Sequence, residues 1–243
     1  MNKNQLTNFI TKYTLGGEIK STKWTSNGDS LSTRFISGDK SVVGKVVLSK
    51  FSHLSPCELG VYNTGQLSSL LSVLGDDIDI NLSQSGDKFI SMEFEDTKRK
   101  TKSKYMLSDL SVIPTPPALK NLPDSFELGI KVDPYFINTF TSGKSALAEA
   151  ETFTILTENG ETKIVIGYAS IASNRVTIPV ETTKNAEIEP ISFNANMFAS
   201  ILNANKDCES ATLEVSSAGL SRIQFAIDNY DSEYFLVSTQ AVN

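Results

Sequence analysis

The chain has 243 residues, of which 40% are hydrophobic and 21% charged, a composition typical of a folded protein and too apolar for a disordered one. This length allows one large domain or two smaller ones, and no apolar run approaches the roughly 18 residues of a membrane-spanning helix. The formal net charge is −6, with 14 basic against 12 acidic residues at 1–118 and 8 against 16 at 119–243. Non-specific nucleic-acid binders are usually basic, so this chain binds a polyanion only if its cations gather on one surface.

Four amphipathic segments recur along the chain, and their apolar residues are spaced to form one stripe of an α-helix. They are Leu6, Phe9, Ile10 and Tyr13; Leu67, Leu70, Leu71 and Leu74; Phe136 and Phe140; and Met197, Phe198, Ile201 and Leu202. The first members lie 61, 69 and 61 positions apart, and Glu58-Leu59-Gly60-Val61 returns as Glu127-Leu128-Gly129-Ile130. The sequence is therefore a nested duplication of four units paired into two halves.

Alternating apolar and polar residues predict strands after each helix, because Asn-Gly and Gly-Asp pairs between such runs are hairpin signals. The predicted strands are 18–26, 31–37 and 42–48; 77–83, 88–95 and 104–110; 152–157, 162–169 and 175–181; and 211–216, 222–228 and 234–239. Each unit reads β-α-β-β-β, and the first unit lacks the opening strand. Helices on one face of the sheets give an α+β fold, with the helices on the concave side and the sheets outside.

These units define the expected domains. The N-terminal domain spans 1–111 with units 1–57 and 58–111, and the C-terminal domain spans 125–243 with units 125–185 and 186–243. Residues 112–124 contain four prolines, which favour an extended, exposed connector.

The whole pattern resembles the sliding DNA clamps, the processivity factors of DNA polymerases, and it is most similar to the bacteriophage, trimer-forming branch. The segments that carry the resemblance are 58–95, 126–169 and 191–238, together with Lys104-Tyr105-Met106-Leu107-Ser108-Asp109-Leu110. The resemblance implies a closed ring of three chains, with helices facing a hole through which double-stranded DNA passes. It implies a non-enzymatic protein without cofactors that tethers a replicative DNA polymerase and is placed on DNA by a clamp-loader ATPase.

The alternative hypothesis is a duplicated, β-rich structural protein of the virion type, without a DNA role. Assembly size distinguishes the two, because a clamp stops at three copies whereas a structural protein forms larger assemblies. The N-terminus has no apolar signal segment and the two cysteines, Cys57 and Cys208, give no disulfide framework. We therefore expect a cytoplasmic protein, in the host cell if the chain is viral.

Lysine and arginine side chains on and near the helices are the candidate DNA contacts, because phosphate contact needs charge and no sequence readout. Residues 98–104 contain five bases and no acid; the other reading of this run is a solvated hairpin tip. The complete set is Lys3, Lys12, Lys20, Lys23, Lys98, Arg99, Lys100, Lys102, Lys131, Lys144 and Lys206.

Two further surfaces follow from the resemblance. Strand pairing between 104–110 of one chain and 175–180 of the next implies a trimer interface, with packing by Tyr105, Leu107, Val176 and Ile178. The resemblance also implies a pocket for partner peptides beside the connector. The alternative is that the apolar residues there only cover the core between the two halves. These residues are Val112, Ile113, Leu119, Leu122, Ala241 and Val242.

The remaining motifs point away from catalysis. Gly143-Lys144-Ser145 resembles the end of a phosphate-binding loop, but Asn138 stands where that motif needs glycine. Asp76, Asp77 and Asp79 fit a solvated turn better than a cation site. His53, the one histidine, has no acid nearby in the sequence. We therefore expect no catalytic residues and no metal site.

Overall fold

The computed structural model describes residues 1–118, 122–123, 125–169 and 174–239. The chain divides into two compact units. Unit 1 is made of Met1–Gly38, Gly44–Pro117 and Asp228–Ser232. Unit 2 is made of Asp39–Val43, Ala118–Ile227 and Glu233–Asn243. Each unit therefore takes a short segment from the other half of the sequence.

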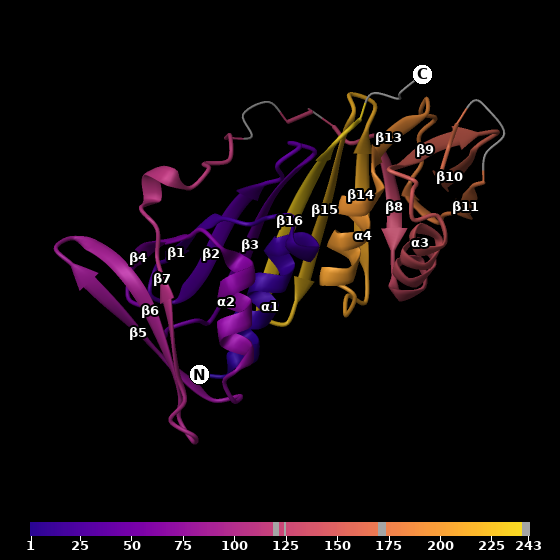
Figure 1. Ribbon diagram of the computed structural model, residues 1–243. Helices are drawn as coiled ribbons and strands as arrows, with labels where there is room; N and C mark the ends of the chain where they lie inside the picture. The colour runs from indigo at the N-terminus through magenta and orange to yellow at the C-terminus, as the bar shows by residue number, and fades with distance from the viewer. Residues whose placement is uncertain (119–121, 124, 170–173, 240–243) are drawn as a thin grey trace. The chain divides into compact units, whose positions relative to one another are not determined.

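Unit 1 has two helices that pack on each other beside antiparallel sheets (Figure 1). The helices are α1 (Lys3–Thr14) and α2 (Thr64–Ser72), with short 3₁₀ helices η1 (Leu15–Gly17) and η2 (Leu110–Val112). One set of strands, ordered β3-β2-β1-β4, comprises β1 (Thr22–Ser26), β2 (Ser30–Ile36), β3 (Val42–Ser49) and β4 (Cys57–Val61). A second sheet, ordered β5-β6-β7, comprises β5 (Ile78–Ser85), β6 (Lys88–Asp96) and β7 (Lys102–Met106).

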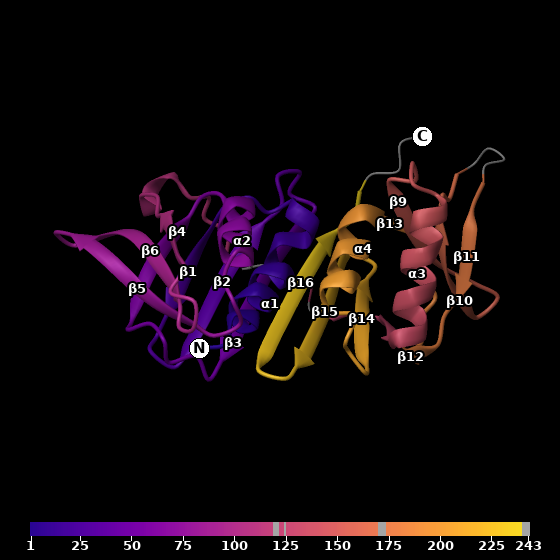
Figure 2. The ribbon, with the colours of Figure 1, turned by 60° about the horizontal axis from the view of Figure 1, so that its bottom comes forward.

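Unit 2 repeats this plan, and its helices α3 (Pro134–Ala146) and α4 (Ala195–Ala204) also lie side by side (Figure 2). One set of strands, ordered β12-β8-β14-β15-β16, comprises β8 (Leu128–Val132), β12 (Thr182–Lys184), β14 (Ala211–Ser216), β15 (Leu220–Ile227) and β16 (Tyr230–Val237). The other sheet, ordered β11-β10-β9-β13, comprises β9 (Thr152–Glu158), β10 (Glu161–Ile166), β11 (Val176–Pro179) and β13 (Ile191–Asn194). The expected α+β class is confirmed.

All four helices begin in the same way, with an Asn or Asp side chain that accepts a backbone N–H of the first turn. The capping residues are Asn2, Asn63, Asp133 and Asn194. Such a cap satisfies one of the N–H groups that a helix start leaves without a partner, and it stabilises the helix by about 1 kcal/mol. The caps recur at nearly the spacing of the apolar stripes, so each unit carries its own signal for where its helix starts.

An aromatic cluster fills the core of unit 1. The Phe9 ring centroid lies 5.5 Å from those of both Tyr13 and Trp24, in edge-to-face geometry. The Trp24 indole N–H donates to the Tyr13 hydroxyl at 3.2 Å, so the polar atoms of both rings are paired although both side chains are fully buried. Burial raises the pKa of the Tyr13 hydroxyl far above its ordinary value.

Phenylalanine side chains fill the core of unit 2 in the same way. Phe198 of α4 stacks on Phe153 with centroids 4.8 Å apart, and meets Phe140 of α3 edge-on, also at 4.8 Å. All three side chains are fully buried. The predicted apolar helix stripes are thus confirmed as the contacts that hold helices and sheets together.

Several predicted strands differ from the structure in their bounds; the strand expected at 162–169 ends at Ile166, and the strand expected at 234–239 begins at Tyr230. The strand expected at 18–26 begins only at Thr22, because Gly16 and Gly17 take positive φ angles and redirect the chain after α1. The strand expected at 175–181 ends at Pro179, whose lack of an N–H limits pairing, and β12 follows it separately. The strand expected at 104–110 occupies Lys102–Met106 instead, and after one more hydrogen bond, from Leu107 N–H to Ile90, the chain leaves β6.

Replacing Phe198 with alanine is expected to lower the free energy of unfolding by about 3–5 kcal/mol, because it leaves a cavity among three other rings. Urea denaturation of the purified chain measures this loss. Tyr135→Ala is the matched control, since the Tyr135 side chain is 78% exposed and its removal should change stability by less than about 0.5 kcal/mol. Equal effects of the two substitutions would contradict the described core.

Candidate nucleic-acid interface

The exposed faces of the four helices carry neutral polar side chains. They are Asn4, Thr7, Asn8 and Thr11 on α1; Gln66, Ser69 and Ser72 on α2; Asn138, Ser142 and Ser145 on α3; and Asn196 and Asn203 on α4. All four helices fall within the described ranges, and their charged residues are limited to Lys3, Lys12 and Lys144. The helix faces therefore offer hydrogen bonds and almost no charge.

The three helix lysines turn their ammonium groups toward the protein. Lys3 Nζ donates to the carbonyl oxygen of Leu74 at 2.5 Å, just beyond the end of α2. Lys144 Nζ donates to that of Ala148 at 2.7 Å, just beyond the end of α3. Lys12 Nζ lies 5.4 Å from the centroid of the Tyr230 ring. Free carbonyls at helix C-termini and aromatic faces both attract cations.

This geometry corrects two sequence predictions. Lys12 and Lys144 are only 5% and 7% exposed, so the expectation that they project from the helices toward DNA is wrong. Both lie in the last turn of their helices, where the ammonium group satisfies local carbonyls or contacts an aromatic ring instead. Lys3 is half-buried and shares this role.

Several hydroxyls on the helix faces are also engaged within their own helix. Thr11 Oγ1 donates to the carbonyl oxygen of Thr7 at 2.9 Å, Ser69 Oγ to that of Gly65 at 3.0 Å, and Ser145 Oγ to that of Thr141 at 2.9 Å. Such back-bonding is usual for Ser and Thr inside helices. The outward-facing hydrogen-bond donors are therefore chiefly the amide groups of the asparagine and glutamine side chains.

The basic run at residues 98–104 is partly charge-compensated, because three carboxylates pair with its four lysines. Carboxylates pair with four of its lysines: Lys98 with Asp77 at 2.8 Å, Lys100 and Lys102 with Glu95 at 3.5 and 3.0 Å, and Lys104 with Glu93 at 2.8 Å. These lysine side chains stay more than half exposed, and exposed ion pairs contribute only about 0–1 kcal/mol. A phosphate can displace such a carboxylate, but the run is not the uncompensated patch that the sequence indicates.

Asp96 fixes the turn that carries this run. Its Oδ1 accepts the backbone N–H groups of Lys98 and Arg99, both at 2.8 Å, and its Oδ2 accepts that of Gly75 at 2.8 Å. These hydrogen bonds, that of Arg99 foremost, lower the pKa of the Asp96 carboxyl. The carboxylate therefore ties the β6–β7 turn to the loop after α2.

The other predicted cations divide into two groups. Lys131 pairs with Glu181 at 2.8 Å, which raises the pKa of its ammonium group. Within the described part of the chain, no ion pair engages the second group, which comprises Lys20, Lys23, Arg99 and Lys206. Of these four, Lys20, Arg99 and Lys206 are exposed. Lys23 is half-buried and lies on the face of β1 opposite Trp24, so it points away from α1, and the expectation that it contacts DNA from beside the helices is wrong.

The four residues predicted for the trimer interface differ in burial. Tyr105 and Ile178 are 2% and 4% exposed, so both side chains pack inside their own unit, and the Tyr105 hydroxyl accepts the N–H of Asn63 at 2.9 Å. Leu107 and Val176 are half-buried, and Leu107 follows β7 rather than lying within it. The two strands concerned, β7 and β11, are each the last strand of a sheet, so each has one open backbone edge.

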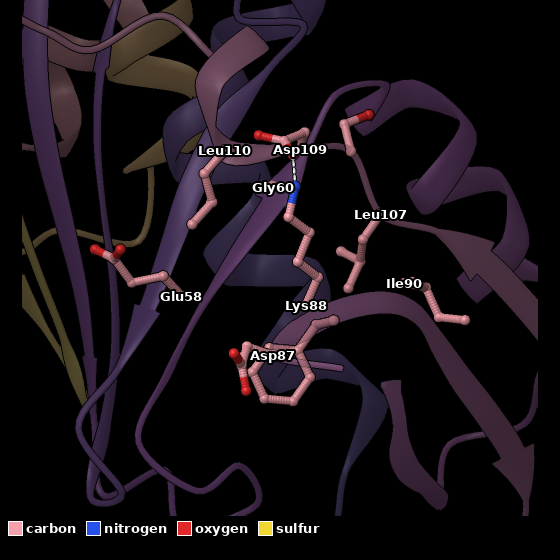
Figure 3. Close-up of a pocket in the computed structure, with 10 residues that line it drawn as sticks. Glu58, Gly60, Asp87, Lys88, Ile90, Leu107, Asp109 and Leu110 are labelled. Atoms are coloured by element: carbon pink, nitrogen blue, oxygen red, sulfur yellow. Dashed lines mark hydrogen bonds and ion pairs between the residues drawn. The ribbon is translucent and has the colours of Figure 1, made fainter. Parts of the chain in front are cut away.

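The predicted peptide-pocket residues are likewise divided. Val112 and Leu122 are 57% and 39% exposed, whereas Ile113 is buried. Leu119, Ala241 and Val242 lie outside the described residues. No sequence pattern indicated a cavity of about 490 Å³ in unit 1, which is lined by residues of β4, by 87–90 and by 107–110, just before this connector (Figure 3).

Metal clusters and membrane-spanning helices are both absent from the described ranges. No three His, Cys, Asp or Glu side chains gather closely enough there to hold a metal ion. Of the helices in those ranges, none has the length and apolarity to cross a membrane.

Replacing Lys144 with methionine is expected to lower the free energy of unfolding by about 1–3 kcal/mol, because the substitution removes a buried, charged donor to the carbonyl groups that follow α3. Thermal and urea denaturation measure the change. Lys206→Met removes an exposed lysine that has no ion pair and should change stability by less than about 0.5 kcal/mol. A destabilisation by Lys206→Met but not by Lys144→Met would contradict the assigned roles.

Comparison with known proteins identifies the fold. No protein-family model and no curated protein matches the sequence. The structure is similar to the crystal structure of Proliferating Cellular Nuclear Antigen from Entamoeba histolytica, with a TM-score of 0.75 and 14% sequence identity over 98% of this chain and 96% of that chain. At this identity the likeness establishes the fold, and the chain has the α+β DNA clamp fold over essentially its whole length.

Proposed function

We propose that the chain is a sliding clamp that encircles double-stranded DNA and tethers a replicative DNA polymerase. The observation that carries this proposal is the agreement of its fold with that of a nuclear antigen of the clamp type over 98% of the chain. Enclosure holds the polymerase at high effective concentration without tight binding to DNA. A clamp-loader ATPase would open the ring, because a closed ring cannot thread circular DNA.

The proposed ring has three copies, as in the bacteriophage-type clamps that the sequence resembles. The open edges of β7 and β11 support this arrangement, since pairing β7 of one copy with β11 of the next makes a head-to-tail contact that can close. Tyr105 and Ile178 would act from inside their own units by holding these edges in position. Met106, 60% exposed on β7, is the apolar side chain available at the joint.

DNA contact in the proposed ring comes from the neutral helix faces together with a few free cations. Asn and Gln side chains hydrogen-bond phosphate oxygens without adding charge, and Lys20 and Lys206 supply limited electrostatic attraction. Weak, sequence-independent contact permits sliding, and the acidic surface elsewhere disfavours binding of DNA from outside. We keep the connector, with its exposed Val112 and Leu122, as the proposed docking segment for polymerase peptides.

Mass photometry tests the assembly. Three copies of the 26.5 kDa chain give about 80 kDa, and no larger species should accumulate. Met106→Asp places a charge on the β7 edge and is expected to yield folded monomers, because the side chain is exposed within the unit. Ile178→Asp does not serve here, since it buries a charge inside unit 2.

Val112→Asp, an equally exposed apolar position outside both edge strands, is the control and should stay trimeric. If the Met106→Asp variant still formed trimers, the assignment of β7 to the interface between copies would be wrong. Large regular assemblies of the unaltered chain would favour the virion-type structural protein instead.

Salt dependence tests the mode of DNA contact. Fluorescence anisotropy on a short duplex with open ends should show affinity falling gently with salt. Replacing Lys20 and Lys206 with glutamine should lower the slope of log affinity against log salt by about 0.9 for each phosphate that is no longer neutralised.

The matched control replaces two other exposed lysines, Lys45 and Lys50, with glutamine. Its slope should equal that of the unaltered protein. A change in the control, or an unchanged slope in the test variant, would refute the assigned contacts.

A further inference from the structure

The cavity in unit 1 lies between β4, the start of β6 and the segment that follows β7 (Figure 3). Its volume is about 490 Å³. The lining residues are Glu58, Gly60, Asp87, Lys88, Phe89, Ile90 and 107–110. It is open to solvent along the side chains of Glu58, Asp87 and Ile90, which are all exposed. Of the described residues predicted as a peptide pocket, Val112, Ile113 and Leu122, none lines it.

The chain forms this cavity by crossing from one sheet to the other. Leu107 N–H donates to the carbonyl oxygen of Ile90 on β6 at 2.9 Å, and Ser108 N–H donates to that of Gly60 on β4 at 2.9 Å. Glycine is required at position 60, since a Cβ atom there would lie 2.3 Å from the Ser108 carbonyl oxygen. The crossing holds the edges of β4 and β6 on either side of the cavity and closes one end.

Both strand edges stay open beyond the crossing. In the described ranges, Cys57, Glu58 and Leu59 pair only with β1, and β4 is the last strand in its order. Lys88 and Phe89 pair only with β5, because β7 pairs with β6 from Ser91 onward. An open strand edge offers backbone N–H and C=O groups to an extended segment from another chain.

The charge of the cavity is negative. Lys88 Nζ bonds Asp109 Oδ2 at 2.5 Å, as the dashed line in Figure 3 marks. This bond lowers the pKa of the Asp109 carboxyl and raises that of Lys88, so the pair stays ionised and neutral overall at pH 7. Glu58 and Asp87, in the described structure, have no ion pair that offsets them.

Apart from Ser108, the remaining lining is apolar. Ile90 and Leu107 lie on one side and Leu110 on the other (Figure 3). Ile90 is 38% exposed, and a segment that covered the cavity would bury it. An occupant that fits these surfaces is extended, carries a large apolar side chain, and carries positive charge beside it.

We propose that this cavity binds an extended peptide segment of a partner protein, in which a large apolar residue is flanked by lysine or arginine. The segment would add its backbone to the β4 edge, insert its apolar side chain beside Ile90 and Leu107, and place its cations near Glu58 and Asp87. The proposal rests on unit 1 alone and does not depend on DNA encirclement.

Fluorescence anisotropy tests it with a labelled, end-blocked hexapeptide, lysine-leucine-lysine-valine-lysine-threonine, and the same peptide with glutamate in place of lysine. The lysine peptide should bind and the glutamate peptide should not. The double variant Glu58→Gln, Asp87→Asn should weaken binding roughly tenfold, as should Ile90→Ser. The matched control, Glu187→Gln with Glu189→Gln, changes two exposed acids of unit 2 and should bind within about twofold of the unaltered protein.

Location is checked by replacing the leucine of the peptide with a photoreactive benzoylphenylalanine. Cross-links should fall within residues 87–90 or 107–110, and urea denaturation should show that each variant is folded. Equal binding by every variant, or cross-links elsewhere, would overturn the proposal. So would absence of peptide binding combined with a smaller assembly for Ile90→Ser, because a second copy of the chain would then occupy the cavity.

Discussion

Burial of one apolar stripe on each of four helices is the constraint on which the rest of this structure depends. The helices have only 9 to 13 residues, and helices of that length are marginal in water unless they pack. Phe9 packs on Trp24 of β1 in unit 1, and Phe140 and Phe198 pack on Phe153 of β9 in unit 2. Once the stripes are buried, the opposite faces alone remain for solvent or a partner.

Those opposite faces are neutral because the helix lysines take structural positions. Lys144 satisfies carbonyls beyond α3, Lys3 does so beyond α2, and Lys12 lies near the Tyr230 ring. A clamp whose helices line a hole would therefore hold DNA by enclosure with little ionic attraction. In such a ring, retention on DNA does not require tight binding to DNA, and weak contacts between the helices and DNA would allow the ring to slide.

Much of the fold was predictable from periodicity. The stripe from Leu6 to Tyr13 matched α1, the run 211–216 matched β14, and the duplication predicted the same plan in both units. The first residue of each helix was also predictable, since the capping residues Asn2, Asn63, Asp133 and Asn194 recur with the repeats. The predicted strand boundaries were wrong where the chain passes from one sheet to another, as after Met106, because hydrogen bonds to residues distant in the sequence determine where the strand ends.

The charged site was less predictable. Burial of Lys12 depends on Tyr230, more than two hundred residues away, and no local pattern indicates it. The compensation of the basic run did leave a signal, because Glu93 and Glu95 face Lys104 and Lys102 across a hairpin whose register follows from its turn. The cavity at Gly60 left no signal in the sequence, since it arises from the contact of that residue with Ser108.

Threading onto linear DNA tests the central claim, encirclement, most directly and needs no loader. The labelled protein is incubated with a linear duplex before or after both ends are blocked by bound streptavidin, and high salt then removes externally bound protein. The account predicts that protein added before blocking stays on the DNA, that protein added afterwards does not, and that cutting the duplex releases it. Equal retention in both orders, or retention after cutting, would contradict encirclement.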